Sequence, residues 1–182
     1  LRNSILQMHQ SKKGFQENPK PVSDYILHGR YQDQVKAQGF MPYMKPFYDL
    51  LEKYRGKMIY LDFWAPWCPP CLAEMEPLKE LRKKYKTEDI VFITICRGDN
   101  RKRLKEVLDK YEMHVSGIEH ILTDDLQDDN NVHKMYNQLN VNRFPHYFII
   151  NREGVIVNYG SMMRPSYPGT AICIEHWLGK GD

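Results

Sequence analysis

Two cysteines close together follow an apolar run in the middle of the chain. The run Met58 to Trp64 has the length and composition of a buried β-strand, and the sequence WCPPC follows it at residues 67–71. Proline suits the first turn of a helix, because its missing amide breaks few hydrogen bonds there and its φ is already helical. The pattern therefore predicts a strand, a tight turn, and a helix that begins at Cys68.

This position favours redox chemistry. A cysteine at a helix start lies beside unpaired backbone amides and the positive end of the helix dipole, which stabilise its thiolate. Cys71 follows close enough along the helix to form a disulfide with Cys68. The prolines leave chiefly the amide of Cys71 to donate to a Cys68 thiolate, and a less stabilised thiolate makes a less oxidising dithiol. We therefore expect a dithiol that reduces other disulfides.

Two other uses of the pair stay open at this point. Zinc needs further ligands, and the remaining cysteines, Cys96 and Cys173, form no second pair of suitable spacing. We therefore expect no metal and no other cofactor. A purely structural disulfide would close a very short loop and would constrain little of the unfolded chain. Cys96 and Cys173 are expected to be buried, unreactive thiols, with a bond between them as the alternative.

Composition excludes some classes of function. The chain has 182 residues, of which 42% are hydrophobic and 27% charged, enough for one substantial core. Its net charge is +3, and its most basic segment, residues 97–105, is followed by acidic residues on the same predicted helix. Such mixed charge is typical of a solvated helix, so we expect no nucleic-acid partner.

The hydrophobic pattern predicts alternating strands and helices. The expected strands are Met58–Trp64, Ile90–Ile95, His120–Leu122, Tyr147–Ile150 and Val155–Val157. The expected helices are Pro42–Tyr54, Cys68–Tyr85 with a kink at Pro77, Arg101–Tyr111, Val132–Leu139 and Thr170–Leu178. The acidic segment 124–129 lacks the glycine and the final glutamate of a calcium loop, and is expected to be a helix-capping loop. Residues 1–40 are polar with weak helical periodicity, so we expect an N-terminal extension there and a domain at 41–182.

A family resemblance adds to this pattern. The segment Leu61 to Cys71 resembles the active-site strand and helix start of thioredoxin-fold proteins. Further landmarks follow in the family's order, namely Phe144-Pro145 before an apolar strand, a turn at 151–154, and Gly160. The resemblance covers about residues 57–178 and is closest to the TlpA/ResA-like thiol-disulfide oxidoreductases of the bacterial envelope. It implies an α/β thioredoxin-like fold, with a central mixed β-sheet flanked by helices and a strand-helix insertion before the cis-proline strand.

The resemblance also implies roles for individual residues. Cys68 would be the nucleophile and Cys71 would resolve the mixed disulfide, while Asp62 matches the buried acid that takes the proton of the resolving cysteine. Burial raises the pKa of such a carboxyl, as a base working near neutral pH requires. A water-facing carboxylate at the strand edge is the alternative. The family's partner lysine has no counterpart in residues 90–95, so the proton route is left to Asp62 with water, or to Glu74 or Glu76.

Substrate binding is implied for the surroundings of the cysteines. Pro145 matches the family's cis-proline, whose geometry would leave the backbone of Phe144 free to pair with an extended substrate segment. Trp64, Trp67 and Pro66 would supply apolar surface around Cys68, with Trp64 as a core residue as the alternative. Trp67 and Pro69 are also expected to bind substrate. His146 departs from the threonine usual in thioredoxins, and either tunes the thiols or is an ordinary satisfied polar residue.

The expected function is reduction of protein disulfides through the dithiol. Its partners would be a disulfide-bonded protein and a membrane or envelope electron donor, in the bacterial envelope or periplasm. Because the chain opens with Leu1, we expect an anchoring segment to be missing from this fragment. The alternatives are a redox-inactive thioredoxin-fold binding module and an oxidase or isomerase of disulfides. Peroxide reduction is disfavoured, since the activating arginine of that chemistry is absent around Cys68.

Overall fold

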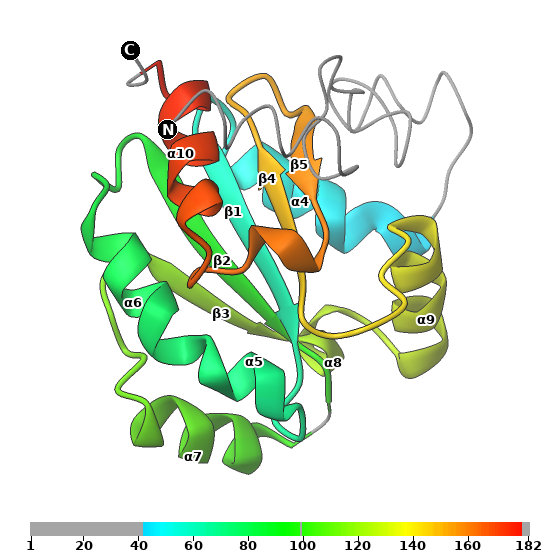
Figure 1. Cartoon of the computed structure of the whole chain (residues 1–182). Coiled ribbons are helices and arrows are strands. Elements are labelled where there is room, and N and C mark those ends of the chain that lie inside the picture. The colour runs from blue at the N-terminus through cyan, green and yellow to red at the C-terminus, as the bar shows by residue number, and fades with distance from the viewer. Residues whose placement is uncertain (1–41, 99, 180–182) are drawn as a thin grey trace.

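The computed structural model describes residues 42–98 and 100–179, and the predicted extension at 1–40 lies outside them. Helices and strands alternate along these residues and carry the labels of Figure 1. The strands are β1 (Met58–Trp64), β2 (Ile90–Cys96), β3 (Ile118–Leu122), β4 (His146–Ile150) and β5 (Ile156–Tyr159). The helices are η1 (Pro42–Met44), α4 (Lys45–Lys53), α5 (Pro69–Ala73), α6 (Met75–Lys83), α7 (Arg101–Lys110), α8 (Thr123–Leu126), α9 (Asp129–Gln138), η2 (Ser161–Met163) and α10 (Pro168–Trp177).

The strands form one mixed sheet in the order β3-β2-β1-β4-β5. β1 pairs in parallel with β2, and β2 with β3, whereas β4 runs antiparallel to both β1 and β5. β1 therefore occupies the centre, and its residues are all buried, which its continuous apolar sequence requires. The predicted α/β fold with a central mixed sheet is confirmed.

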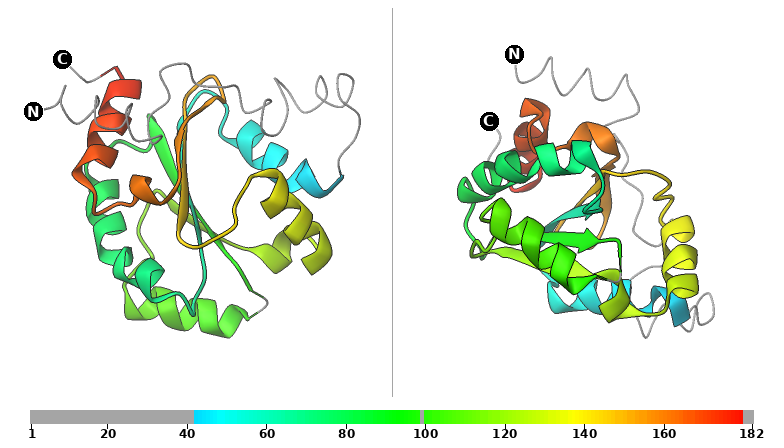
Figure 2. Two further views of the ribbon diagram at one scale, coloured as in Figure 1. Left: turned by 45° about the vertical axis from the view of Figure 1, so that its right-hand side comes forward. Right: turned by 90° about the horizontal axis from the view of Figure 1, so that it is seen from below.

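Helices cover both faces of the sheet (Figure 2). One apolar cluster joins even-numbered residues of β1 and β2, such as Tyr60 and Phe92, to α6, α7 and α10, and it includes both Cys68 and Cys71. A second cluster joins the odd-numbered residues of these strands, such as Leu61 and Ile93, to α4 and α9. Because side chains alternate between the faces of a strand, each strand contributes to both clusters.

The helix predicted from Cys68 to Tyr85 with a kink at Pro77 is instead two helices. α5 ends and α6 begins at Glu74, which lies before the proline. Pro77 has no amide for the carbonyl of Ala73, so the helix is interrupted before it, and the break at Glu74 places the proline in the first turn of α6, where a missing amide costs little. The break therefore falls one turn earlier than the kink expected from the sequence.

Between β2 and β4 lie α7, β3, α8 and α9, so the predicted strand-helix insertion is present. β3 begins at Ile118 rather than at His120, because its first residues pair with Phe92 and Ile93 of β2. The acidic segment is not a loop throughout, since its first half forms α8. Its second half does cap a helix, because the Asp128 side chain accepts a hydrogen bond from the amide of Asn131 at the start of α9.

The hairpin predicted around residues 151–154 joins β4 to β5. β5 begins at Ile156 rather than at Val155, because the side chain of Asn151 accepts hydrogen bonds from the amides of Glu153 and Val155. These bonds hold Val155 in the turn. The hairpin itself is confirmed, with β5 shifted toward Tyr159.

Candidate active site

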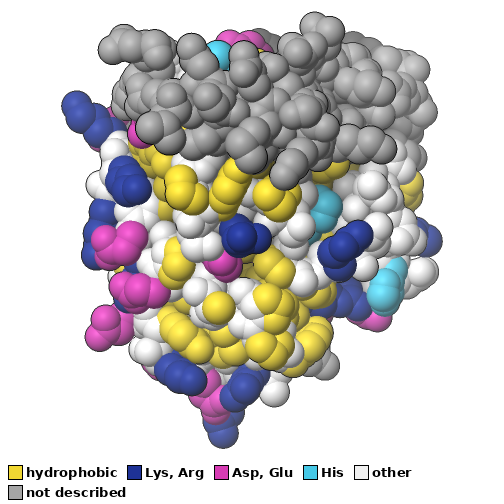
Figure 3. Space-filling view, in the orientation of Figure 1, with side chains coloured by type: hydrophobic (Ala, Val, Ile, Leu, Met, Phe, Trp, Pro, Cys, Tyr) yellow, Lys and Arg dark blue, Asp and Glu magenta, His cyan; other side chains and the backbone are white. Residues whose placement is uncertain are grey.

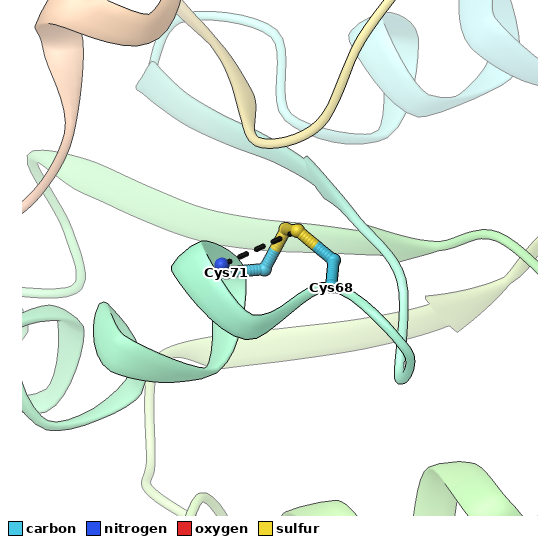
Figure 4. Close-up of a disulfide and its surroundings, with 2 residues drawn as sticks. All are labelled: Cys68 and Cys71. Atoms are coloured by element: carbon cyan, nitrogen blue, oxygen red, sulfur yellow. Dashed lines mark hydrogen bonds between the residues drawn. A yellow bond between two sulfur atoms is a disulfide. The ribbon is translucent and has the colours of Figure 1, made fainter.

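Cys68 and Cys71 form a disulfide at the N-terminus of α5 (Figure 4). Cys68 is the N-cap, with extended backbone, and Pro69 and Pro70 occupy the first helical positions. The amide of Cys71 donates to the sulfur of Cys68 over 3.3 Å, and it is the side-chain cap of this helix. The predicted helix start and the predicted amide donor are both confirmed.

The two cysteines differ little in burial, but Cys71 is the more covered. Cys68 is 8% exposed and Cys71 is 2% exposed, whereas Trp67, directly before them, is 65% exposed. One side of the indole lies against the backbone at Gly98, where an added Cβ would be 3.5 Å from the ring. Figure 3 shows apolar side chains gathered over α5 and the loop that leads into β4. The disulfide thus lies under a rim of apolar surface.

The loop before β4 contributes Phe144 and Pro145. The peptide bond between them is cis, as the resemblance implied. His146, the next residue, pairs with Phe63 of β1, so Pro145 lies across from the end of the strand that leads to Cys68. The Phe144 ring packs edge-on against Tyr136 of α9 with centroids 5.9 Å apart. The structure therefore brings the loop to the carboxyl end of β1.

Asp62 lies inside the molecule on the same side of the sheet as the cysteines. It is 3% exposed, and its Oδ1 has no hydrogen-bond partner among the described residues. Burial, together with the nearby charge of Glu74, raises the pKa of Asp62 well above its usual value. The predicted buried carboxyl is confirmed, and the alternative of a water-facing carboxylate at the strand edge is wrong.

The two glutamates considered for a proton route differ sharply. Glu74, at the break between α5 and α6, accepts hydrogen bonds from the amide and hydroxyl of Ser166, at 2.8 and 2.7 Å. Glu76 points to solvent and pairs with Lys79 at 2.7 Å. Of these two glutamates, Glu74 is the one whose charge adds to burial in raising the pKa of Asp62, so it is the one close enough to affect the buried acid.

His146 lies on the other face of the sheet. Its ring packs 4.9 Å from that of Phe148, within the cluster that α4 and α9 cover. Burial, and then the charge of Arg143, lowers the pKa of His146 to about 4. The imidazole is therefore neutral at pH 7 and brings no positive charge to the thiols.

The other cysteines are free and buried, so a bond between them is absent. Cys96 ends β2, and Cys173 in α10 accepts a hydrogen bond from the side chain of Asn158 over 3.4 Å. Burial raises the pKa of each thiol to about 12. These values fit the predicted unreactive thiols.

Sequence reasoning did not single out the polar residues beside Asp62. The strand register places Tyr147 and Thr94 on either side of Asp62, and His120 beside Thr94. A threonine inside the apolar run of β2 was the one signal in the sequence, but only the register shows that it is the neighbour of Asp62.

No described group of three or more histidine, cysteine or acidic side chains is placed to hold a metal ion. The helices among the described residues are too short or too polar to cross a membrane.

Comparison with known proteins agrees with this geometry. The model of the Redoxin family matches residues 47–166. ResA from Geobacillus kaustophilus, a thiol-disulfide oxidoreductase, is 28% identical over 106 residues, which cover 58% of this chain and 55% of that protein. ResA from Bacillus thuringiensis subsp. konkukian is 32% identical over 63 residues, or 35% of this chain and 36% of that protein. The chain thus spans about half the length of these relatives or less.

Solved structures extend the likeness over more of the chain. A Bacteroides vulgatus protein, assigned by inference as a thiol-disulfide oxidoreductase, is 32% identical with a TM-score of 0.56, covering 71% of this chain and 78% of that one. A thiol:disulfide interchange protein from Bacteroides sp. has a TM-score of 0.58 at 18% identity, with coverage of 71% and 78%, and supports the fold alone. The chain therefore belongs to the Redoxin family, as a TlpA/ResA-like protein of thioredoxin fold.

Proposed function

We propose that this protein reduces disulfide bonds of protein substrates through Cys68 and Cys71. The observation that carries the proposal is the Cys68–Cys71 disulfide at the start of α5, where the Cys71 amide alone caps the Cys68 sulfur. Family membership supports it, since relatives are named thiol-disulfide oxidoreductases. With one amide donor, the Cys68 thiolate is stabilised only modestly, which favours giving electrons over taking them.

The reaction begins with the reduced protein. The Cys68 thiolate attacks one sulfur of the substrate disulfide, and the other substrate sulfur leaves as a thiolate that takes up a proton. Cys71 then gives its proton to Asp62 and attacks the sulfur of Cys68. The second substrate sulfur departs as a thiolate and takes up a proton, which Asp62 can return, and the two electrons of the dithiol have passed to the substrate. The protein is left with the Cys68–Cys71 disulfide, as in Figure 4.

Substrate would bind on the apolar rim around the disulfide. Trp67 and Pro69 are exposed beside Cys68, and Phe144 and Pro145 are half-buried across from the end of β1. An extended segment can pair with the backbone of Phe144 while the apolar surface covers the reacting sulfurs. These residues recognise a backbone and a disulfide rather than one sequence.

The wider setting completes the proposal. A donor in the membrane or envelope would return two electrons to the disulfide after each turnover, in the bacterial envelope or periplasm. Residues 41–182 would form the thioredoxin-like domain, with residues 1–40 as its extension. An oxidase or isomerase would need a more stabilised Cys68 thiolate, and a redox-inactive binding module would need neither thiol.

Insulin reduction by dithiothreitol tests the activity. The protein should accelerate it, and Cys68→Ser should abolish the acceleration. Cys96→Ser is the matched control, because it removes a buried free thiol outside α5, and it should retain activity. Cys71→Ser should accumulate mixed disulfides with substrate through Cys68. Equal activity of the wild type and Cys68→Ser would show that the dithiol is not the reductant.

The two prolines offer a test of electron direction. Pro70 occupies the second helical position, whose amide in other residues points at the cap, whereas Pro69 occupies the first. Pro70→Ala should therefore add a donor to the Cys68 thiolate and raise the reduction potential by roughly 30 mV, the equivalent of about 1.4 kcal/mol. Pro69→Ala, the matched control, should leave the potential unchanged. A wild-type potential near that of a strong oxidant would overturn the reductive direction.

A further inference from the structure

Polar side chains stand at one level across the sheet, beside the buried acid. Asp62 of β1 is in register with Thr94 of β2, and Thr94 with His120 of β3. Neighbouring strands lie about 4.8 Å apart, so side chains in register on one face are neighbours. Each of the three lies two residues along its strand from a member of the cluster that contains Cys68 and Cys71, and residues two apart share a face. The row therefore lies on the same face as the disulfide.

Hydrogen bonds fix the tautomer of His120. Its Nε2 lies 2.9 Å from the carbonyl oxygen of Met113, which can only accept, so Nε2 carries the hydrogen. Burial lowers the pKa of His120, so the ring is neutral at pH 7 and has one N–H. Nδ1 is then an acceptor, and the Thr94 hydroxyl, 2.7 Å away, donates its hydrogen to it.

This arrangement limits what Thr94 offers to Asp62. Its only hydroxyl hydrogen is held by His120, so its oxygen can offer only lone pairs to Asp62, its neighbour in register on β1. A carboxylic acid can donate to that oxygen, but a carboxylate cannot. Asp62 Oδ1 is buried and no described group donates to it, Thr94 included, so Thr94 acts on the carboxyl as its neighbour in register and not through a hydrogen bond already formed.

We propose that His120 acts through Thr94 on Asp62: neutral His120 holds the Thr94 hydroxyl hydrogen, and the Thr94 oxygen then favours the proton-bearing form of the Asp62 carboxyl. Thr94 and His120 are positioning residues. The inference rests on the proposed function, in which Asp62 takes the proton of Cys71. By keeping the pKa of Asp62 raised, the pair would make its carboxylate a better acceptor for the proton of the Cys71 thiol.

Other groups also face this row. The Tyr60 hydroxyl donates to the carbonyl of Met163 over 2.6 Å and is already used. The Tyr147 hydroxyl and the Cys96 thiol are buried near Asp62, and Glu74 adds a negative charge. Each of these is unchanged in variants of Thr94 and His120, so its effect on Asp62 cancels in a comparison.

His120 has its own surroundings. His114 is the titratable group whose charge lowers the pKa of His120, and it is exposed and paired with Asp109 at 2.8 Å. The neighbouring Glu119 alternates to the other face of β3, where Lys53 pairs with it at 2.7 Å. His114 is therefore the matched control for a change at His120.

The test is a pH titration of the Asp62 carboxyl by carbon-13 NMR in the full chain. His120→Phe releases the Thr94 hydroxyl to donate to the carboxylate, so the Asp62 pKa should fall by about one unit. With Thr94→Val as background, His120→Phe should produce no fall. Thr94→Ser, which keeps the hydroxyl, and His114→Phe should both titrate like the wild type. An Asp62 pKa that rises, stays, or falls equally in the valine background overturns the inference.

A measurement on the unaltered protein does not depend on how the variants fold. Nitrogen-15 shifts of the His120 ring at pH 7 should show the hydrogen on Nε2, and a hydrogen on Nδ1 overturns the inference. Insulin reduction separates the two proposals. If the protein reduces insulin but the Asp62 pKa is the same in His120→Phe as in the wild type, only this inference fails. If it does not reduce insulin, the proposed function fails, while the titration still decides whether His120 acts on Asp62.

Discussion

Leu61 and Asp62 are neighbours in β1, yet they face opposite layers of the molecule. The side with Leu61, under α4 and α9, is packed with aliphatic and aromatic side chains, with His146 at its edge. The side with Asp62 holds a carboxyl, a threonine and a tyrosine hydroxyl in register, next to the disulfide. Because side chains alternate between the faces of β1, the carboxyl lies on the same side as the disulfide and Leu61 lies on the other.

Both sides bury polar atoms that have no partner among the described residues. Asp62 Oδ1 and the Tyr147 hydroxyl are buried without partners among the described residues, and each such group opposes folding. On the Leu61 side the Tyr136 hydroxyl and His146 Nε2 are also buried without described partners, and large side chains are fully buried on both sides, such as Phe92 on one and Phe63 on the other. What sets the Asp62 side apart is that its polar groups lie in register beside the disulfide. Substitutions on the two sides should therefore differ in kind as well as in size.

Leu61→Ala should give the largest change in stability. Leu61 is fully buried, so its truncation leaves a cavity and should lower the free energy of unfolding by about 4 kcal/mol. The reduction potential should stay at the wild-type value, because the residue faces away from the cysteines. Denaturant unfolding and a thiol redox titration measure the two quantities. A shifted potential would break the separation between the faces.

His146→Phe should remove a dependence of the free energy of unfolding on pH, of a size similar to the effect of Leu61→Ala. The His146 pKa is about 4 in the folded protein and about 6.5 when unfolded. Between these values only the unfolded chain takes up a proton, so wild-type stability should fall by about 3 kcal/mol as pH drops from 6.5 to 4. The free energy of unfolding, measured at several pH values across this range, should fall by about 3 kcal/mol less in the variant than in the wild type. Equal slopes would mean that the ring is protonated in the fold.

Asp62→Asn should slow the reaction without lowering stability at pH 7. Loss of the proton acceptor for Cys71 should reduce the rate of release of the mixed disulfide by roughly 10²-fold. Because the folded pKa of Asp62 is raised, wild-type stability is full below the unfolded value, near pH 3.8, and is lost as pH rises toward the folded value. The variant should lack this loss.

Stopped-flow fluorescence and unfolding at several pH values check both parts of the Asp62 prediction. The gain in stability of the asparagine variant over the wild type should grow from pH 4 upward. Leu61→Ala is the control at the adjacent position, and its loss of stability should not vary with pH in this way. An asparagine variant that is as fast as wild type would remove Asp62 from the reaction.

Trp67→Ala should have the smallest effect, since the side chain belongs to neither face. It is 65% exposed, so the free energy of unfolding should change by less than about 0.5 kcal/mol. The KM for insulin should rise about fivefold, equivalent to about 1 kcal/mol of binding. Trp67→Phe should keep most of the affinity. Unchanged KM in the alanine variant would place substrate binding elsewhere on the rim.

Local chemistry in the sequence was enough to predict much of the site. β1 has the bounds that its apolar run indicated, and Cys68 caps α5 through the one amide that the two prolines leave. The cis bond at Phe144-Pro145 followed from resemblance rather than from composition. The strand and the helix start are decided by a few adjacent residues, which is why the sequence alone predicted them, whereas the cis bond required the resemblance.

Features that depend on distant partners were out of reach. The contact of Glu74 with Ser166 joins residues 92 apart in the chain. The row of Thr94 and His120 beside Asp62 requires the register of three strands. The break at Glu74 was placed at Pro77 because the proline acts on the turn before it, where the pattern of apolar residues continues unbroken.

The order of strands has a consequence for how the protein matures. β1 lies between β2 and β4, and β4 is synthesised long after the cysteines have left the ribosome. Tyr147 of β4 flanks Asp62, and the loop before β4 brings Phe144 and Pro145 to the end of β1, so these neighbours are in place only once β4 has paired with β1. In the proposed reaction Asp62 takes the proton of Cys71, and Phe144 and Pro145 bind the substrate. A nascent chain would therefore carry both thiols before the residues that assist them are all in place, and reduction of a substrate would begin only after β4 has joined the sheet.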